Sequence, residues 1–296
     1  MSNERHLPRL RAVATHPVVQ AGQPSILLRD PLRLANKTVV IPQQLAPLLA
    51  LCDGTRDPNG IRASLAVRFG LRIAPHTIER LLAALDDSLL LDNDRFAQAR
   101  ERALMEYRQA PFRPPTSVGQ SYPSSAEDLH AKLDGYMDAV DDVRPGSADG
   151  RGLVSPHIDY ERGGTVYARV WKRAAEAVKA ADLVVLLGTD HYGKDGHLTL
   201  TRQHYATPFG VLPTEQTIVD ALAEAIGPEA AFADELYHRS EHSIELAAVW
   251  LHHVREGQPC DLVPILCSSF GHLIWGGAEP EHDRRSTHCC PHSSRP

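Results

Sequence analysis

The chain has 296 residues and a net charge of −6, with 43% hydrophobic and 23% charged residues. This balance is typical of a globular protein and excludes a strongly basic, nucleic-acid-binding protein. Uninterrupted apolar stretches stay well short of the roughly 18 residues that a membrane span needs. The N-terminus lacks an apolar signal core, and the five cysteines contain no C-x-x-C pair. We therefore predict a cytoplasmic protein with neither nucleic acid nor membrane as a partner.

The first part of the chain predicts a small helical domain. Residues 1–27 have mixed composition, and we expect them to be disordered. Residues 28–100 show a pattern of short strands and helices whose apolar residues recur at helical spacing. The expected elements are a hairpin of 32–34 with 39–41, helices near 43–52, 61–69 and 78–85, and a strand at 89–91. This combination resembles a winged-helix module, including the peptide-recognition version found beside radical-SAM maturases. It predicts either a peptide-binding role or a structural cap.

Residues 101–125 are predicted to connect this domain to a second one. They begin with the end of a helix over 97–110 and continue as a segment rich in Pro, Gly and Ser, which marks a boundary loop. A helix is expected over 129–140. We therefore place the second domain at residues 126–275.

The second domain alternates apolar runs with helical patterns, which indicates an α/β fold. Strands are predicted at 152–155 and 183–187, with a helix over 165–180 between them. Such a unit has the length of a right-handed crossover, which makes its two strands parallel. Helices capped by Thr214 and Ser240 and a third buried strand at 262–266 follow.

Two histidines follow the predicted strands directly, and they predict a metal site. His157 comes after the run at 152–155, and His191 comes after the run at 183–187. Parallel strands present their carboxyl ends at one edge of a sheet, where ligands collect. Neutral imidazole is a common ligand for zinc, iron and copper.

Further polar residues are expected around these two histidines. Asp159, Tyr160 and Asp190 lie in the same loops, and either aspartate can orient a histidine. Glu241 and His242 are predicted at the start of a helix as the catalytic pair for proton transfer. The remaining pocket-lining candidates are His238, Glu245 and His272.

At these residues the chain resembles the Memo-like family, known as AmmeMemoRadiSam system protein B. The order and spacing of its motifs agree with the family over roughly residues 113–273. The matching segments are Gly119–Pro123, Ser155–Tyr160, Gly188–His191, Ala206–Gly210, Glu241–Glu245 and Val263–Leu266.

The resemblance implies a three-layer αβα fold shared with class III extradiol dioxygenases, which use non-haem ferrous iron (Fe2+). It implies His157 and His191 as the first two metal ligands, with His242 and Glu241 lining the pocket. Copper and zinc are the other candidate metals. It also implies AMMECR1-like and radical-SAM proteins of the same system as partners.

The family's third ligand, a Cys or an equivalent polar residue, is expected on a strand beyond residues 263–266. Residues 276–296 lack helical or strand periodicity, so we interpret them as an irregular, frameshifted or truncated tail. We therefore expect impaired metal binding, with His272 as a candidate replacement ligand.

Three functions remain open at this point. The first is a dioxygenase-like, metal-dependent oxidoreductase, in which Glu241 or His242 acts as the base. The second is a non-catalytic adaptor whose winged-helix-like module binds a peptide or partner protein. The third is a zinc hydrolase, in which metal-bound water is the nucleophile.

Overall fold

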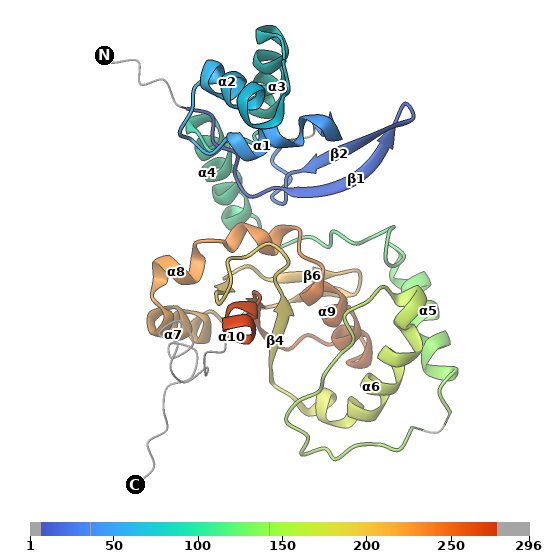
Figure 1. Ribbon diagram of the computed structural model, residues 1–296. Coiled ribbons are helices and arrows are strands. Elements are labelled where there is room, and N and C mark those ends of the chain that lie inside the picture. The colour runs from blue at the N-terminus through green and yellow to red at the C-terminus, as the bar shows by residue number, and fades with distance from the viewer. Residues whose placement is uncertain (1–6, 36, 142, 277–296) are drawn as a thin grey trace. The chain divides into compact units, whose positions relative to one another are not determined.

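The computed structural model describes residues 7–35, 37–141 and 143–276. The chain forms two compact units that divide after Glu106 (Figure 1). The predicted tail from 276 onward lies, apart from its first residue, outside the described part of the chain. Among the described helices, none combines the length and apolar character that crossing a bilayer requires.

Unit 1 begins with a three-stranded antiparallel sheet in the order β1–β2–β3. The prediction of disorder for residues 1–27 is therefore wrong from residue 14 onward. The turn between β1 and β2 places Ala21 and Gly22 at positive φ (47° and 75°), a conformation that suits a tight hairpin. Ala is an unusual residue there, so the sequence carries no turn signal. The strands are β1 (Ala14–Gln20), β2 (Gln23–Arg29) and β3 (Val39–Pro42).

Four helices and one short 3-10 turn follow the sheet, at the positions that apolar spacing predicts. Two strand predictions are wrong. β3 pairs with β2 rather than with residues 32–34. Asp30 accepts hydrogen bonds from the backbone N–H groups of Leu32 and Leu34, so the chain turns there. Residues 89–91 form only a bridge from Leu91 to Leu10. The elements are η1 (Gln43–Leu45), α1 (Ala46–Leu51), α2 (Pro58–Phe69), α3 (Pro75–Asp87) and α4 (Asp94–Gln109).

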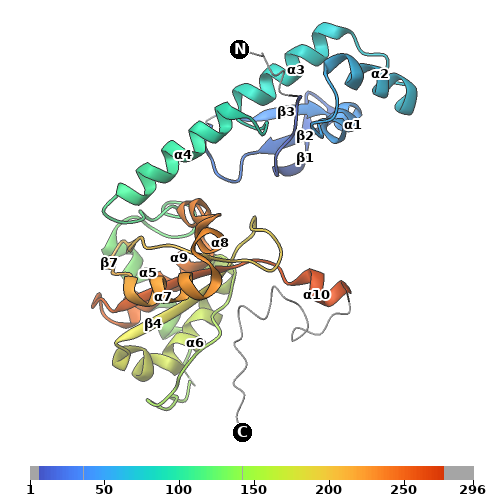
Figure 2. The same ribbon diagram turned by 90° about the vertical axis from the view of Figure 1, so that its left-hand side faces the viewer.

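Unit 2 is built on a sheet in the order β4–β8–β5, in which β4 and β8 are parallel. Helices α6 and α9 pack against one face, and α7 and α8 pack against the other (Figures 1 and 2). This is an α/β fold, as predicted. The strands are β4 (Leu183–Thr189), β5 (Leu198–Leu200), β6 (Tyr205–Thr207), β7 (Gly210–Leu212) and β8 (Asp261–Cys267). The helices are α5 (Ala126–Asp138), α6 (Tyr160–Ala180), α7 (Gln216–Ile226), α8 (Pro228–Phe232), η2 (Glu235–Arg239), α9 (Ser243–Val254) and α10 (Gly271–Gly276).

The predicted strand at 152–155 is wrong, since residues 151–157 have irregular backbone. Val154 is 90% exposed, so the apolar run is not buried on both faces. The segment is tethered to α6 by the Trp171 indole, which donates to Ser155 Oγ at 3.1 Å. His157 is therefore carried by a loop that leads into α6, whereas His191 follows β4 as expected.

Strand β4 lies at an edge of its sheet, and the described residues cover only one of its faces. Val184 and Leu186 pack into the core with α6 and α9. On the opposite face, Leu183, Val185 and Leu187 are 39%, 50% and 70% exposed. The described chain therefore presents a row of apolar side chains along β4.

Gly188 allows the start of α9 to lie directly on the end of β4. A Cβ atom at this position would come within 2.4 Å of Ile244 Cγ1 and 2.7 Å of Ser243 Oγ. The Ser243 hydroxyl donates to the Thr189 carbonyl at 2.9 Å. This close approach places the residues just before α9 beside the loop that follows β4.

We predict that Gly188→Ala lowers the free energy of unfolding by about 1–3 kcal/mol, because its methyl group overpacks this contact. Gly135→Ala is the control: a Cβ there in α5 would meet nothing within 4 Å, so higher helix propensity should stabilise the chain by about 1 kcal/mol. Denaturant unfolding followed by tryptophan fluorescence reports on unit 2, which holds all three tryptophans. Equal effects of the two substitutions would contradict this account of Gly188.

Candidate metal centre

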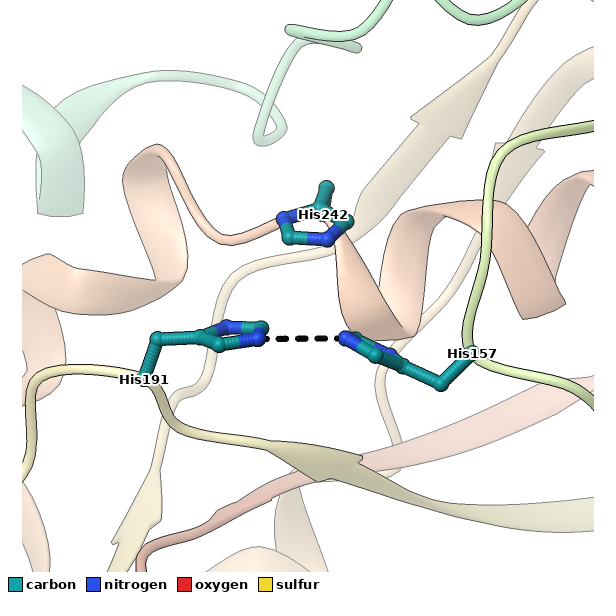
Figure 3. A group of neighbouring side chains, drawn as sticks. All are labelled: His157, His191 and His242. Carbon is teal, nitrogen blue, oxygen red and sulfur yellow. Dashed lines mark hydrogen bonds between the residues drawn. The ribbon is translucent and has the colours of Figure 1, made fainter.

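Three histidines from three separate segments meet at one place on unit 2 (Figure 3). His157 comes from the loop before α6, His191 from the loop after β4, and His242 is the residue before α9. One ring nitrogen from each lies within 4.8 Å of the other two. All three side chains are exposed, so the cluster is open to solvent.

The spacing of these rings fits ligands of a single ion. The Nε2 atoms of His157 and His191 are 3.1 Å apart. Metal–nitrogen bonds of about 2.0–2.1 Å place neighbouring ligand atoms at about 3 Å, so one ion can contact both. The ring of His242 stacks on His191, with centroids 5.0 Å apart and planes 14° from parallel.

The carboxylate of Glu241 contacts two of the three imidazoles. Its Oε2 accepts from His191 Nδ1 at 2.8 Å, and its Oε1 lies 3.1 Å from His242 Nδ1. Backbone N–H groups of His242 and Ser243 also donate to Oε1. Burial favours the neutral acid, but the hydrogen bonds from His191 and His242 outweigh it and hold the pKa of Glu241 well below its ordinary value. The carboxylate thus stays charged.

The surroundings of His157 and His191 shift the pKa values of the two imidazoles in opposite directions. The hydrogen bond to Glu241 raises the pKa of His191, although partial burial opposes it. Burial, followed by repulsion from His242 and His191, lowers the pKa of His157. Glu241 holds the Nδ1 proton of His191, so Nε2 is the nitrogen that faces His157.

The other residues expected near the site support its framework. Asp190 accepts the backbone N–H groups of Tyr192 and Gly193, which shapes the turn behind His191. Asp159 caps the N-terminus of α6 by accepting from Arg162 N. The buried Tyr160 hydroxyl donates to the Leu246 carbonyl at 2.7 Å.

The structure does not bring His238 or His272 into the three-histidine group. His238 is fully buried; its Nδ1 accepts from the Tyr205 hydroxyl, and its Nε2 donates to the Thr199 carbonyl. Burial lowers the pKa of His238 to about 3, which keeps it neutral. His272 lies on α10 and packs against Gly196, where a Cβ would come within 2.8 Å of its ring.

Sequence reasoning missed Arg113, which organises the site from inside the protein. It pairs with Glu245 (Nη1 to Oε2, 2.5 Å), and both side chains are 0% exposed. Arg113 also donates to the backbone carbonyls of His238 and Glu241 at 2.8 and 2.7 Å. Glu245 therefore lies in this buried network, which ties down the chain that carries Glu241 and His242.

The segment that carries Arg113 is part of unit 2, although it was predicted as a linker. Tyr107 opens unit 2, and Arg113, Ser117 and Tyr122 are buried within it. The Ser117 backbone N–H and the Tyr122 hydroxyl both donate to Glu245. The family-like motif at 119–123 is the sequence signal that pointed to this region.

Together, these features define an α/β protein that presents three histidines within metal-binding distance of one another, beside the carboxyl end of a parallel strand. The profile of the Memo-like protein family matches residues 113–273, more than half of the chain, so the chain belongs to this family.

Relatives agree with this assignment. A MEMO1 family protein of Aquifex aeolicus is 28% identical over 225 residues, which cover 76% of this chain and 58% of the relative. One from Methanosarcina acetivorans is 32% identical over 161 residues, which cover 54% of each chain. One from Methanopyrus kandleri is 30% identical over 162 residues, which cover 52% of this chain and 55% of the relative. The chain thus spans somewhat more than half the length of these relatives.

We predict that Arg113→Ala destabilises unit 2 by about 3–5 kcal/mol, because it leaves the Glu245 carboxylate buried without its cation. Lys179→Ala is the control: the Lys179–Glu256 pair is 2.6 Å long, but its side chains are 47% and 76% exposed. Loss of such a surface pair should change stability by less than about 1 kcal/mol. Denaturant unfolding measures both variants. Similar decreases in the free energy of unfolding would contradict the expectation that the buried Arg113 pair matters more for stability than an exposed one.

Proposed function

We propose that His157, His191 and His242 bind one non-haem ferrous ion and that the chain is a dioxygenase-like, metal-dependent oxidoreductase. The observation that carries this proposal is the approach of three ring nitrogens to within 4.8 Å of one another. An all-imidazole set also accepts copper and zinc, so the metal itself is decided by experiment.

The donor set fits a catalytic rather than a purely structural ion. Three protein ligands leave coordination positions free for oxygen and substrate. The bound ion would supply Lewis acidity and, as iron, one-electron chemistry with O₂. The exposed faces of His157, His191 and His242 give substrate direct access to these positions.

Glu241 and His242 were expected to be the catalytic pair for proton transfer, with one of them as the base, and their geometry favours a different division of roles. Both carboxylate oxygens of Glu241 already accept hydrogen bonds, from His191 and from the backbone of His242 and Ser243. We assign Glu241 as a positioning residue that fixes two imidazoles. His242 then supplies the third ligand, in place of the residue that the resemblance puts on a later strand.

We predict that the chain, purified without oxygen and titrated with Fe2+, loses about one equivalent of bound iron when His157, His191 or His242 is replaced by Ala. Oxygen uptake by the iron-loaded chain should fall with it. His76→Ala, on the exposed surface of α3, is the control and should match the parent. Zinc retention with esterase turnover and no oxygen uptake would instead identify a hydrolase.

Glu241→Gln sharpens this test, because it keeps the shape of the side chain and removes its charge. Loss of a carboxylate behind a ligand histidine weakens metal binding by about 10–100-fold. Iron affinity equal to that of the parent would refute the positioning role of Glu241, whatever the three histidine variants show.

A second role, as an adaptor, is favoured by the sheet of unit 1. β1 lies at the edge of that sheet, and Val19 on it is 77% exposed. An extended peptide can add as a further strand to such an edge. The candidate partners are AMMECR1-like and radical-SAM proteins, or a peptide that they process.

We predict that Val19→Asp weakens binding of these purified partner proteins at least about tenfold, since it puts a charge on the docking strand. Val67→Asp is the matched control, because Val67 is 85% exposed on α2, away from the sheet edge. Biolayer interferometry with the whole chain measures both. Equal loss in the two variants, or no binding by the parent, would remove the adaptor role.

A further inference from the structure

A second pair of histidines in unit 2 lies as close together as His157 and His191. His130 on α5 and His253 on α9 face each other with their Nδ1 atoms 3.1 Å apart. The ring centroids are 5.0 Å apart. Both distances equal those between His157 and His191.

A carboxylate stands behind this pair as well. Asp134 lies one helical turn after His130, and its Oδ1 is 3.3 Å from His253 Nε2. A negative charge there favours a proton on Nε2, which leaves the Nδ1 lone pair of His253 directed at His130. The arrangement corresponds to that of Glu241 behind His191. Metal-binding histidines typically donate their second ring N–H to such a carboxylate.

The pair opens onto a pocket of about 360 Å³, whose lining includes His130, Asp134 and His253. Two further charged residues line it, and Lys179 Nζ is paired with Glu256 Oε1 at 2.6 Å. With that pair neutral as a whole, Asp134 leaves the pocket with a net negative charge. A cation can therefore enter a pocket lined by both histidines, and the charge of Asp134 attracts it there.

Aromatic packing holds both rings in place before any ligand arrives. The Phe209 ring lies 4.4 Å from the His130 ring, and the Trp250 ring meets His253 edge-on at 5.8 Å, each measured between centroids. The His253 side chain is only 6% exposed. Fixed ligand orientation lowers the cost of ordering a metal site.

We propose that His130 and His253 form a second metal site, which binds one divalent transition-metal ion through their Nδ1 atoms, with water at the remaining positions. Asp134 orients His253 and attracts the ion. This site is separate from the three-histidine centre and shares none of its ligands.

Zinc titration with a competing chromophoric chelator tests this site in a chain that carries His157→Ala and His191→Ala. We expect this chain to retain about one zinc equivalent, because the second pair is intact. His130→Gln in the same background should weaken that binding at least about tenfold, and so should Asp134→Asn. His76→Gln is the control and should change nothing.

Two further readouts keep the test decisive. Asp134 is 61% exposed, so Asp134→Asn leaves the fold intact even if His130→Gln disturbs packing. Cobalt in place of zinc reports the coordination through its visible absorption, which should disappear in both variants. Absence of stoichiometric zinc in the double-alanine chain, or zinc binding that ignores both substitutions, overturns the proposal. Neither result bears on the three-histidine centre, which is tested by the His157, His191 and His242 variants.

Discussion

The buried pair of Arg113 and Glu245 is the constraint on which the site in unit 2 depends. An ion pair removed from water is tolerated only when the remaining protons and lone pairs find partners. Glu245 meets this condition by accepting from Arg113, two backbone N–H groups and the Tyr122 hydroxyl, and Arg113 by donating to the backbone just before α9. The start of α9 is thereby fixed in position. Glu241 and His242 immediately precede that helix, so their positions are set by these contacts in the protein interior.

The histidines of the site come from segments of different regularity. His191 follows β4, and Gly188 lets α9 approach that strand closely enough for Glu241 to reach the His191 ring. His157 comes from an irregular segment that is secured to the middle of α6 by the hydrogen bond from Trp171 to Ser155. A charged carboxylate under two imidazoles then orients the ligands without occupying the solvent-facing side. A metal ion would therefore meet a preassembled set of ring nitrogens.

Several of these features follow from the sequence, because they depend on local pattern. Apolar spacing located α2, α3 and α6, and the apolar runs located β4 and β8. The meeting of His157 and His191 was foreseen from sheet geometry, even though residues 152–155 are not a strand. Other features depend on contacts that no local pattern encodes. Arg113 finds Glu245 across 132 positions, and the β1–β2 hairpin turns at Ala21 rather than at a typical turn residue.

The face of β4 that the described residues leave uncovered has a consequence for self-association. Leu183, Val185 and Leu187 form an apolar ridge on an edge strand, and such edges attract other strands. Sulfate and phosphate strengthen apolar association, so self-association of the chain should increase as these salts are added. Since β4 leads directly to His191, self-association along this ridge would crowd the access to the three histidines. The choice of buffer ion therefore affects access to the three histidines as well as solubility.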